Sequence, residues 1–207
     1  MPDRAHESAV ERDALSEETR RALLRLGGVM TFMLLPWIGA MIAIPVGKYG
    51  VPITLQTLAV VLSAVCMGPR FGMVSMLAYI TLGAVGYPVF SDGGHGPGVL
   101  LGQTAGYLLG FVGCQPVIVG FVRRRDGSIR GWGAMIAGML TGHVVIFGVG
   151  VPWLWASRKF WLDDAAITWW DAFYHGCVIF MPGMVLKTGI AVLIGAWAAP
   201  WASRRIW

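Results

Sequence analysis

The chain has 207 residues, of which 56% are hydrophobic and 13% are charged, and its mean hydropathy is +0.65. These values lie outside the range of soluble domains and predict an integral membrane protein. Because one span needs about 20 residues, the chain has room for about six or seven helices and excludes a large separate soluble domain. The net charge of +5 does not indicate a nucleic-acid partner, since Lys and Arg in membrane proteins mainly report topology.

Residues 1–25 are polar and are predicted to form a cytoplasmic amino-terminal segment. Their acidic residues are not compatible with the basic first region of a signal peptide, so we expect the segment to be retained. Within it, "SEETRRALL" is typical of a helix start. Ser16 can cap free backbone N–H groups there, and Glu17 and Glu18 are favourable at the positive end of the helix dipole.

Residues 26–207 are predicted to form one transmembrane domain of six helices, in an all-α fold. The apolar runs divide at charges and at glycine and proline clusters into 26–46, 54–68, 71–88, 99–122, 132–155 and 174–199. The second and third runs are short for straight spans, so we expect them to be tilted or to end beside irregular, protein-lined backbone. Continuously apolar runs do not fit a β-barrel, whose strands alternate apolar and polar residues.

The basic residues predict the orientation in the membrane. With a cytoplasmic amino terminus, only Lys48, Arg158 and Lys159 fall outside, and the residues that fall inside are Arg20, Arg21, Arg25, Arg70, Arg123, Arg124, Arg125, Arg130, Arg204 and Arg205. Short cytoplasmic loops carry an excess of Lys and Arg, so both termini are predicted to be cytoplasmic. The loops around residues 48, 93 and 160 then share the outer side.

The outer loop within "GAVGYPVFSDGGHGPGVLLGQTAGYLLGF" (83–111) is the first candidate site. Glycine permits positive φ and close backbone approach, so this loop can bend back into the protein and present N–H and C=O groups to a ligand. Tyr87, Phe90 and Tyr107 flank it with aromatic rings. Such a pocket suits a small, partly hydrophobic molecule, whereas the alternative, a flexible surface hairpin, leaves the aromatic residues unexplained.

Lys187 and His143 lie well inside predicted spans. Lys187 lies in "FMPGMVLKTGIAVLIGAW", and an ammonium group in lipid costs a few kcal/mol, so we expect it to face the protein interior and bind an anionic ligand. The alternative is that it extends to the membrane interface. His143 has no partner at metal-ligand spacing, and a hydrogen bond between packed helices is expected for it. No metal site is predicted.

Small residues four apart indicate close helix packing. The pattern occurs at Gly102, Gly106 and Gly110, where internal packing is the common use, and at Gly39 and Ala43, which we predict to form a docking surface for a partner subunit. The chain lacks a GxSxG motif, an HExxH motif, a P-loop and paired intramembrane carboxylates. We therefore expect no enzyme activity and no cofactor.

Two long stretches resemble a known family: "VPITLQTLAVVLSAVCMGPRFGMVSMLAYITLGAVGYPVF" (51–90) and "GGHGPGVLLGQTAGYLLGF" (93–111). They are similar to the BioY family, the biotin-binding S components of energy-coupling-factor (ECF) vitamin transporters. Weaker similarity continues through "GVGVPWLWA" (148–156) and "FMPGMVLKTGIAVLI" (180–194). The resemblance implies the ECF S-component fold, with an outward biotin pocket and residence in the bacterial cytoplasmic membrane.

The resemblance also implies partners and site residues. The partners would be an ECF T component and two ABC ATPases, although some family members transport alone. The substrate-binding residues that it implies, together with those argued above, are Gln56, Phe90, Asp92, Gly93, Gly94, Tyr107, Met184 and Lys187. The family pattern in the last helix is Pro-Gly-acid-x-x-Lys, and here Met184 replaces the Asp. A thioether accepts hydrogen bonds only weakly, so the replacement bears directly on ligand identity and affinity.

The predicted function is high-affinity binding and uptake of biotin. Two alternatives stay open at this point. The same scaffold can serve a biotin precursor or another vitamin, as the change at Met184 and the departures at Gln103 and Ala105 from the family's Gly-Pro-Thr-Gly-Gly-Tyr indicate. A membrane helper protein without transport activity is the second alternative.

Overall fold

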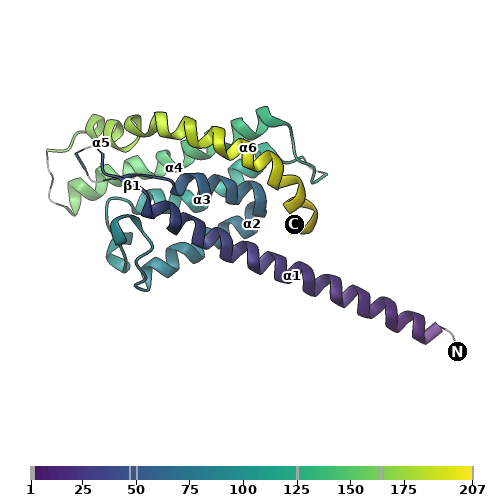
Figure 1. Cartoon of the computed structure of the whole chain (residues 1–207). Coiled ribbons are helices and arrows are strands. Elements are labelled where there is room, and N and C mark those ends of the chain that lie inside the picture. The colour runs from purple at the N-terminus through teal and green to yellow at the C-terminus, as the bar shows by residue number, and fades with distance from the viewer. Residues whose placement is uncertain are drawn as a thin grey trace.

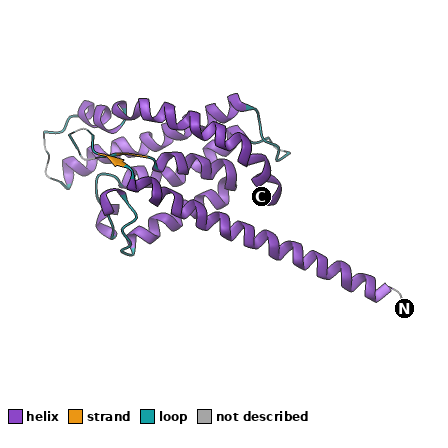
Figure 2. Ribbon diagram, in the orientation of Figure 1, coloured by secondary structure: helices purple, strands orange, loops and turns teal. Residues whose placement is uncertain are grey.

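The computed structural model describes residues 3–46, 48–49, 51–124, 126–162, 164 and 166–206, with side chains from residue 15 onward. Arg125, which was predicted to be cytoplasmic, lies outside the described residues. The described chain is almost entirely helical, with irregular connections (Figure 2). Its elements are α1 (Asp3–Met41), β1 (Ala43–Ile44), β2 (Ile53–Thr54), α2 (Gln56–Ala84), α3 (Ala105–Val122), α4 (Trp132–Phe160), α5 (Trp169–Gly176) and α6 (Met181–Arg205), with 3-10 turns at Ser91–Gly93, Pro97–Leu100 and Val178–Phe180.

Among the described residues, 5 helices are long and apolar enough to cross a membrane. The first of them, α1, is continuous from Asp3 to Met41, so it begins before both the helix start predicted at Ser16 and the apolar run predicted from residue 26. An apolar run marks the part of a helix that is suited to the bilayer, not the whole helix. The segment before position 26 is polar, but it contains Ala, Glu and Arg, which are strong helix formers. Figure 1 shows this part of α1 projecting away from the other helices as a straight rod.

The predicted second and third runs, 54–68 and 71–88, fall mostly in α2, which spans Gln56–Ala84 and is broken at Gly68. Gly68 has φ 76° and ψ 179°, a conformation far from helical, and Pro69 follows it. The chain doubles back there (Figure 1), so that the Gln56 side chain bonds the Tyr79 hydroxyl at 2.7 Å. Each half is shorter than the roughly 20 residues of a straight span, as the lengths of the two runs predicted.

The two-residue strands form an antiparallel ladder, in which Ala43 pairs with Thr54 and Ile44 with Ile53. This ladder is a small exception to the predicted all-α fold. It joins the end of α1 to the start of α2, and the Leu55 N–H also donates to the Gly39 carbonyl at 3.0 Å. The connection therefore holds the segment 51–57 at one end of the bundle.

The helices α3 and α4 pack together through glycines of α3. A Cβ on Gly106 would overlap Trp153 and the Val149 carbonyl, and one on Gly110 would meet the Ile146 backbone at 2.7 Å. The predicted internal packing is confirmed for Gly106 and Gly110, whereas Gly102 lies before α3 and a Cβ there would meet carbonyls of its own loop. At the far end of the molecule, the Arg25 Nε donates to the Ile206 carbonyl at 2.8 Å, so α1 is tied to the end of α6.

Candidate functional site

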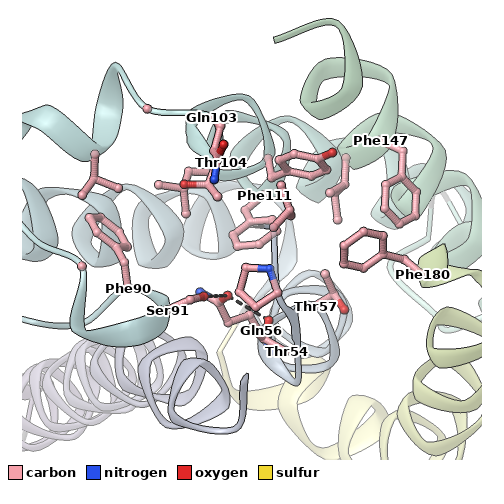
Figure 3. Close-up of a pocket in the computed structure, with 18 of the residues that line it drawn as sticks. Thr54, Gln56, Thr57, Phe90, Ser91, Gln103, Thr104, Phe111, Phe147 and Phe180 are labelled. Atoms are coloured by element: carbon pink, nitrogen blue, oxygen red, sulfur yellow. Dashed lines mark hydrogen bonds between the residues drawn. The ribbon is translucent and has the colours of Figure 1, made fainter. Parts of the chain in front are cut away.

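A cavity of about 530 Å³ opens at the end of the bundle that carries the β1–β2 ladder and the glycine loop. Its walls come from the segment 51–57, the loop 90–104, and the helices α3, α4 and α6 (Figure 3). Of the predicted site residues, the structure brings Gln56, Phe90, Asp92, Gly94, Tyr107, Met184 and Lys187 to this cavity. Gly93 does not line it.

Gln56 joins the three segments that meet at the cavity. Its amide oxygen accepts hydrogen bonds from Thr54 Oγ1 at 2.9 Å and from Ser91 Oγ at 3.1 Å. Its amide nitrogen donates to the Tyr79 hydroxyl, which in turn donates to the Val89 carbonyl at 3.0 Å. Because an amide nitrogen has two hydrogens, Gln56 keeps one donor beyond this network. The Gln56 side chain thus holds the segment 51–57 and the loop 90–104 in place and still faces the cavity (Figure 3).

The glycine loop is anchored to α2 by an aromatic contact. The Phe90 ring lies directly over Gly83, where any Cβ would overlap it, and meets the Tyr79 ring edge-on at 5.5 Å. The Gly96 N–H donates to the Gly83 carbonyl at 2.8 Å. The loop thus bends back onto α2, as predicted, and the alternative of a surface hairpin without anchoring contacts is not what the structure contains. Between these two anchors, Asp92 is exposed and has a positive φ of 56°.

Lys187 faces the protein interior, with only 6% of its surface exposed. Its Nζ donates to the Thr54 carbonyl at 3.0 Å. Lys187 thus does not extend to the interface, and its ammonium group lines the cavity one turn after Met184. An ammonium has three donors, so this one bond leaves two of them available to a ligand.

Aromatic rings make the apolar part of the wall. Tyr107 presents its ring, because its hydroxyl is already bonded to the Gly176 carbonyl at 2.8 Å. Phe147 lies 6.4 Å from the Tyr107 ring and 6.1 Å from the Phe180 ring, measured between centroids. Phe111 completes this side (Figure 3). These rings can pack against a flat or aliphatic ligand without competing for its polar groups.

Four of the polar side chains that line the cavity and were not predicted as site residues are incompletely bonded. Among the described residues, each has a buried atom without a hydrogen-bond partner: Oγ1 of Thr57, Oε1 of Gln103, Nε2 of His143 and Nε of Arg158. The Nδ1 of His143 lies 2.8 Å from the Met139 carbonyl of its own helix, so no bond to another helix is found for it. A buried polar group that lacks a partner costs about 1–3 kcal/mol, which makes the cavity suited to a ligand with polar groups.

Gly39 and Ala43 do not form the helical docking face that was predicted. Gly39 is buried, and a Cβ there would meet the backbone of Leu55 and Gln56 at 2.8 Å. The helix α1 ends at Met41, and Ala43 belongs to β1. The small residue at position 39 instead allows the ladder and the start of α2 to approach α1.

A second hollow lies between α4, α5 and α6, on the outside of the bundle. It measures about 540 Å³ and is lined almost entirely by apolar side chains, among them Val144, Trp169 and Phe173. Phe147 and Met184 line both this groove and the cavity. Position 184 therefore belongs to the wall that separates the cavity from the surface that faces lipid.

Comparisons with known proteins agree on one family. The profile of the BioY family matches residues 13–204. A protein of Thermotoga maritima named biotin transporter BioY is 36% identical over 81% of this chain and 89% of its own length. A protein of Pyrococcus horikoshii named probable biotin transporter BioY is 32% identical over 80% of this chain and 90% of its own.

The fold is also found among solved structures. One described as the S-component for biotin from an ECF-type ABC transporter superimposes with a TM-score of 0.74 and covers 84% of this chain and 89% of its own. The two sequences are 23% identical, so this likeness shows the fold alone. The predicted ECF S-component fold is thus confirmed for the helical bundle described above.

Proposed function

The chain belongs to the BioY family, and from that premise we propose that it takes up biotin across the cytoplasmic membrane as a high-affinity substrate-binding S component. The observation that carries the proposal is the cavity, in which aromatic walls are combined with a buried ammonium group and unpartnered polar atoms. Biotin has matching parts: a polar bicyclic ureido ring, an aliphatic chain and a carboxylate. It is a transported ligand and not a cofactor, and no covalent chemistry is required.

Within this proposal, each of the site residues has a role that fits its contacts. Gln56 and the backbone around Gly94 bond the ureido group. Phe90 and Tyr107 cover the apolar parts, and Lys187 supplies positive charge. Asp92 and Gly93 shape the loop at the cavity mouth, where their positive φ values turn the chain.

We further propose six membrane crossings with both termini in the cytoplasm. The two halves of α2 then count as separate crossings, an assignment supported by the reversal at Gly68. The glycine loop and the cavity would open to the outside. An ECF T component and two ABC ATPases would be engaged from the cytoplasmic side, which carries most of the basic residues.

The test is titration of the purified, detergent-solubilised protein with biotin, dethiobiotin and unrelated vitamins. We expect nanomolar binding that is selective for biotin. A hundredfold excess over the dissociation constant should also stabilise the folded protein by about 2.7 kcal/mol. A membrane helper without a ligand would show neither binding nor this thermal stabilisation, and that result would remove the proposed function.

A second candidate is uptake of a biotin precursor. The specific observation in its favour is Met184, which lines the cavity where the family pattern places an acid. Loss of a hydrogen bond to a charged group removes about 1.5–3 kcal/mol, so a ligand that lacks the matching donor would lose less. Tighter binding of dethiobiotin than of biotin in the same titration would favour this candidate.

A further inference from the structure

Arg158 is the second cation at the cavity. It lies in the last turn of α4 and is half-buried, and it lines the same space as Lys187. Its Nη2 donates to the Tyr49 carbonyl at 3.1 Å, and its guanidinium carbon lies 5.2 Å from the centre of the Tyr49 ring. Tyr49 is itself 2% exposed. The guanidinium group is therefore held in place by a neighbour that neutralises none of its charge.

The charges at the cavity do not balance. Among the described residues that line it, the cations are Arg158 and Lys187 and the one acid is Asp92, which is exposed on the loop. The one ion pair found between described side chains is Arg20 with Glu17, far along α1. A guanidinium has five N–H donors in a planar fork that matches a carboxylate, and Tyr49 accepts from one of them. The buried Nε of Arg158 has no acceptor among the described residues.

The two cations are anchored to different parts of the cavity wall, Lys187 to the Thr54 carbonyl and Arg158 to the Tyr49 carbonyl. Lys187 is fixed to Thr54 and follows Met184, which shares the wall with Phe147 of α4. Arg158 lies eleven residues beyond Phe147 on the same helix, and a rise of 1.5 Å per residue puts their backbones roughly 16 Å apart along the axis. An elongated ligand can therefore reach one cation with each end.

We propose that Arg158 binds the carboxylate of the ligand and so selects for ligands with a free carboxylate, while Lys187 contacts the opposite, ring end. The inference rests on the proposed function, because it assumes that biotin occupies the cavity. It adds an anion-binding residue from the end of α4. It also fixes the direction in which the ligand lies.

The experiment compares biotin with biotinamide, in which the carboxylate is a neutral amide, on wild-type protein and on Arg158→Gln. We expect Arg158→Gln to weaken biotin binding by about tenfold or more, because a charge-assisted pair is lost, and to change biotinamide binding less than about threefold. Arg158→Lys should be intermediate, since it keeps the charge without the fork. Lys159→Gln removes a neighbouring exposed charge and is the matched control, with wild-type affinity for both ligands.

Equal weakening of both ligands by Arg158→Gln would overturn the proposal, because it would mean that Arg158 acts only by holding Tyr49. Unchanged biotin affinity would overturn it too. Thermal unfolding of each variant in detergent shows whether it is folded. If Arg158→Gln does not fold, Arg158→Lys is compared with wild-type protein in its place. Wild-type protein that binds neither ligand would instead contradict the proposed function itself.

Discussion

A buried lysine bonded to a backbone carbonyl sets the chemistry of the site at the scale of single residues. Among the described residues, Lys187 makes no hydrogen bond to an acidic side chain, and its bond to the Thr54 carbonyl ties α6 to the segment that carries Gln56. Burial of a cation without a counter-ion is costly in a membrane protein, which usually means that the residue serves a function. The position of Lys187 therefore favours a ligand that brings negative charge or strong acceptors.

Replacement of Lys187 by Ala should lower biotin affinity by about tenfold or more, since a hydrogen bond to a charged group contributes about 1.5–3 kcal/mol. Calorimetric titration of the purified variant measures this. The matched control is Leu186→Ala, because Leu186 is the adjacent residue and is 67% exposed on the outside of the bundle. Biotin binding that is unchanged in Lys187→Ala would remove Lys187 from the site.

The sequence was informative for those site residues that belong to a recognisable motif or to a charge in an apolar run. Gln56, Phe90, Tyr107 and Lys187 were found in this way, and all four line the cavity. Arg158 was read as an outer-loop cation, because the apolar run appeared to end at residue 155. The helix α4 continues to Phe160 and carries Arg158 back toward the cavity. The approach of Arg158 to the cavity depends on where α4 ends, and hydropathy does not determine that residue.

At the scale of elements, the break in α2 decides how the site is assembled. The reversal at Gly68 brings the start of α2, with Gln56, beside the later half, with Tyr79 and the Gly83 platform for Phe90. Because φ 76° with ψ 179° is essentially confined to glycine, the side chain at position 68 must be absent for the two halves to pack in this way.

Replacement of Gly68 by Ala should destabilise the folded protein by about 1–3 kcal/mol, the cost of forcing a Cβ into this region of backbone conformation. Thermal unfolding in detergent gives the change. Gly120→Ala is the control, since Gly120 lies in the regular helix α3 and a Cβ there meets nothing within 4 Å. A melting temperature of Gly68→Ala equal to that of the control would show that the backbone there is not strained by a side chain.

The sequence predicted the break in α2 and missed the extent of α1, for related reasons. Glycine and proline at positions 68 and 69 mark a chain reversal by their own stereochemistry, so the boundary is local information. The start of α1 at Asp3 has no such marker, because charged residues are compatible with both a cytoplasmic helix and a loop. The two-residue ladder was equally out of reach, since it depends on segments brought together by the fold.

At the scale of the whole molecule, the orientation in the membrane determines from which side the ligand enters. The basic residues predict that the loop carrying His95 faces outward and that the turn carrying Ser128 faces the cytoplasm. Both residues are exposed in the structure. They therefore offer two reporters of topology that do not touch the cavity.

His95→Cys and Ser128→Cys should be labelled from opposite sides of the membrane. Each is made in a background in which the buried Cys66, Cys114 and Cys177 are replaced by Ala. A membrane-impermeant maleimide added to intact cells should react with His95→Cys, and with Ser128→Cys only after permeabilisation. The reverse pattern would place the cavity on the cytoplasmic side and contradict uptake from outside.

The wall formed by Phe147 and Met184 allows the bilayer to influence the proposed binding site. On one side these two side chains line the cavity, and on the other they line the apolar groove on the outside of the bundle, where acyl chains would lie if the helices cross a bilayer as proposed. Lipid is then the second layer of packing around the ligand, in the position that protein side chains occupy in a soluble receptor. The affinity for the ligand then depends on the surrounding lipid as well as on the chain. It should differ between a detergent micelle and a bilayer, because the two pack differently against Phe147 and Met184.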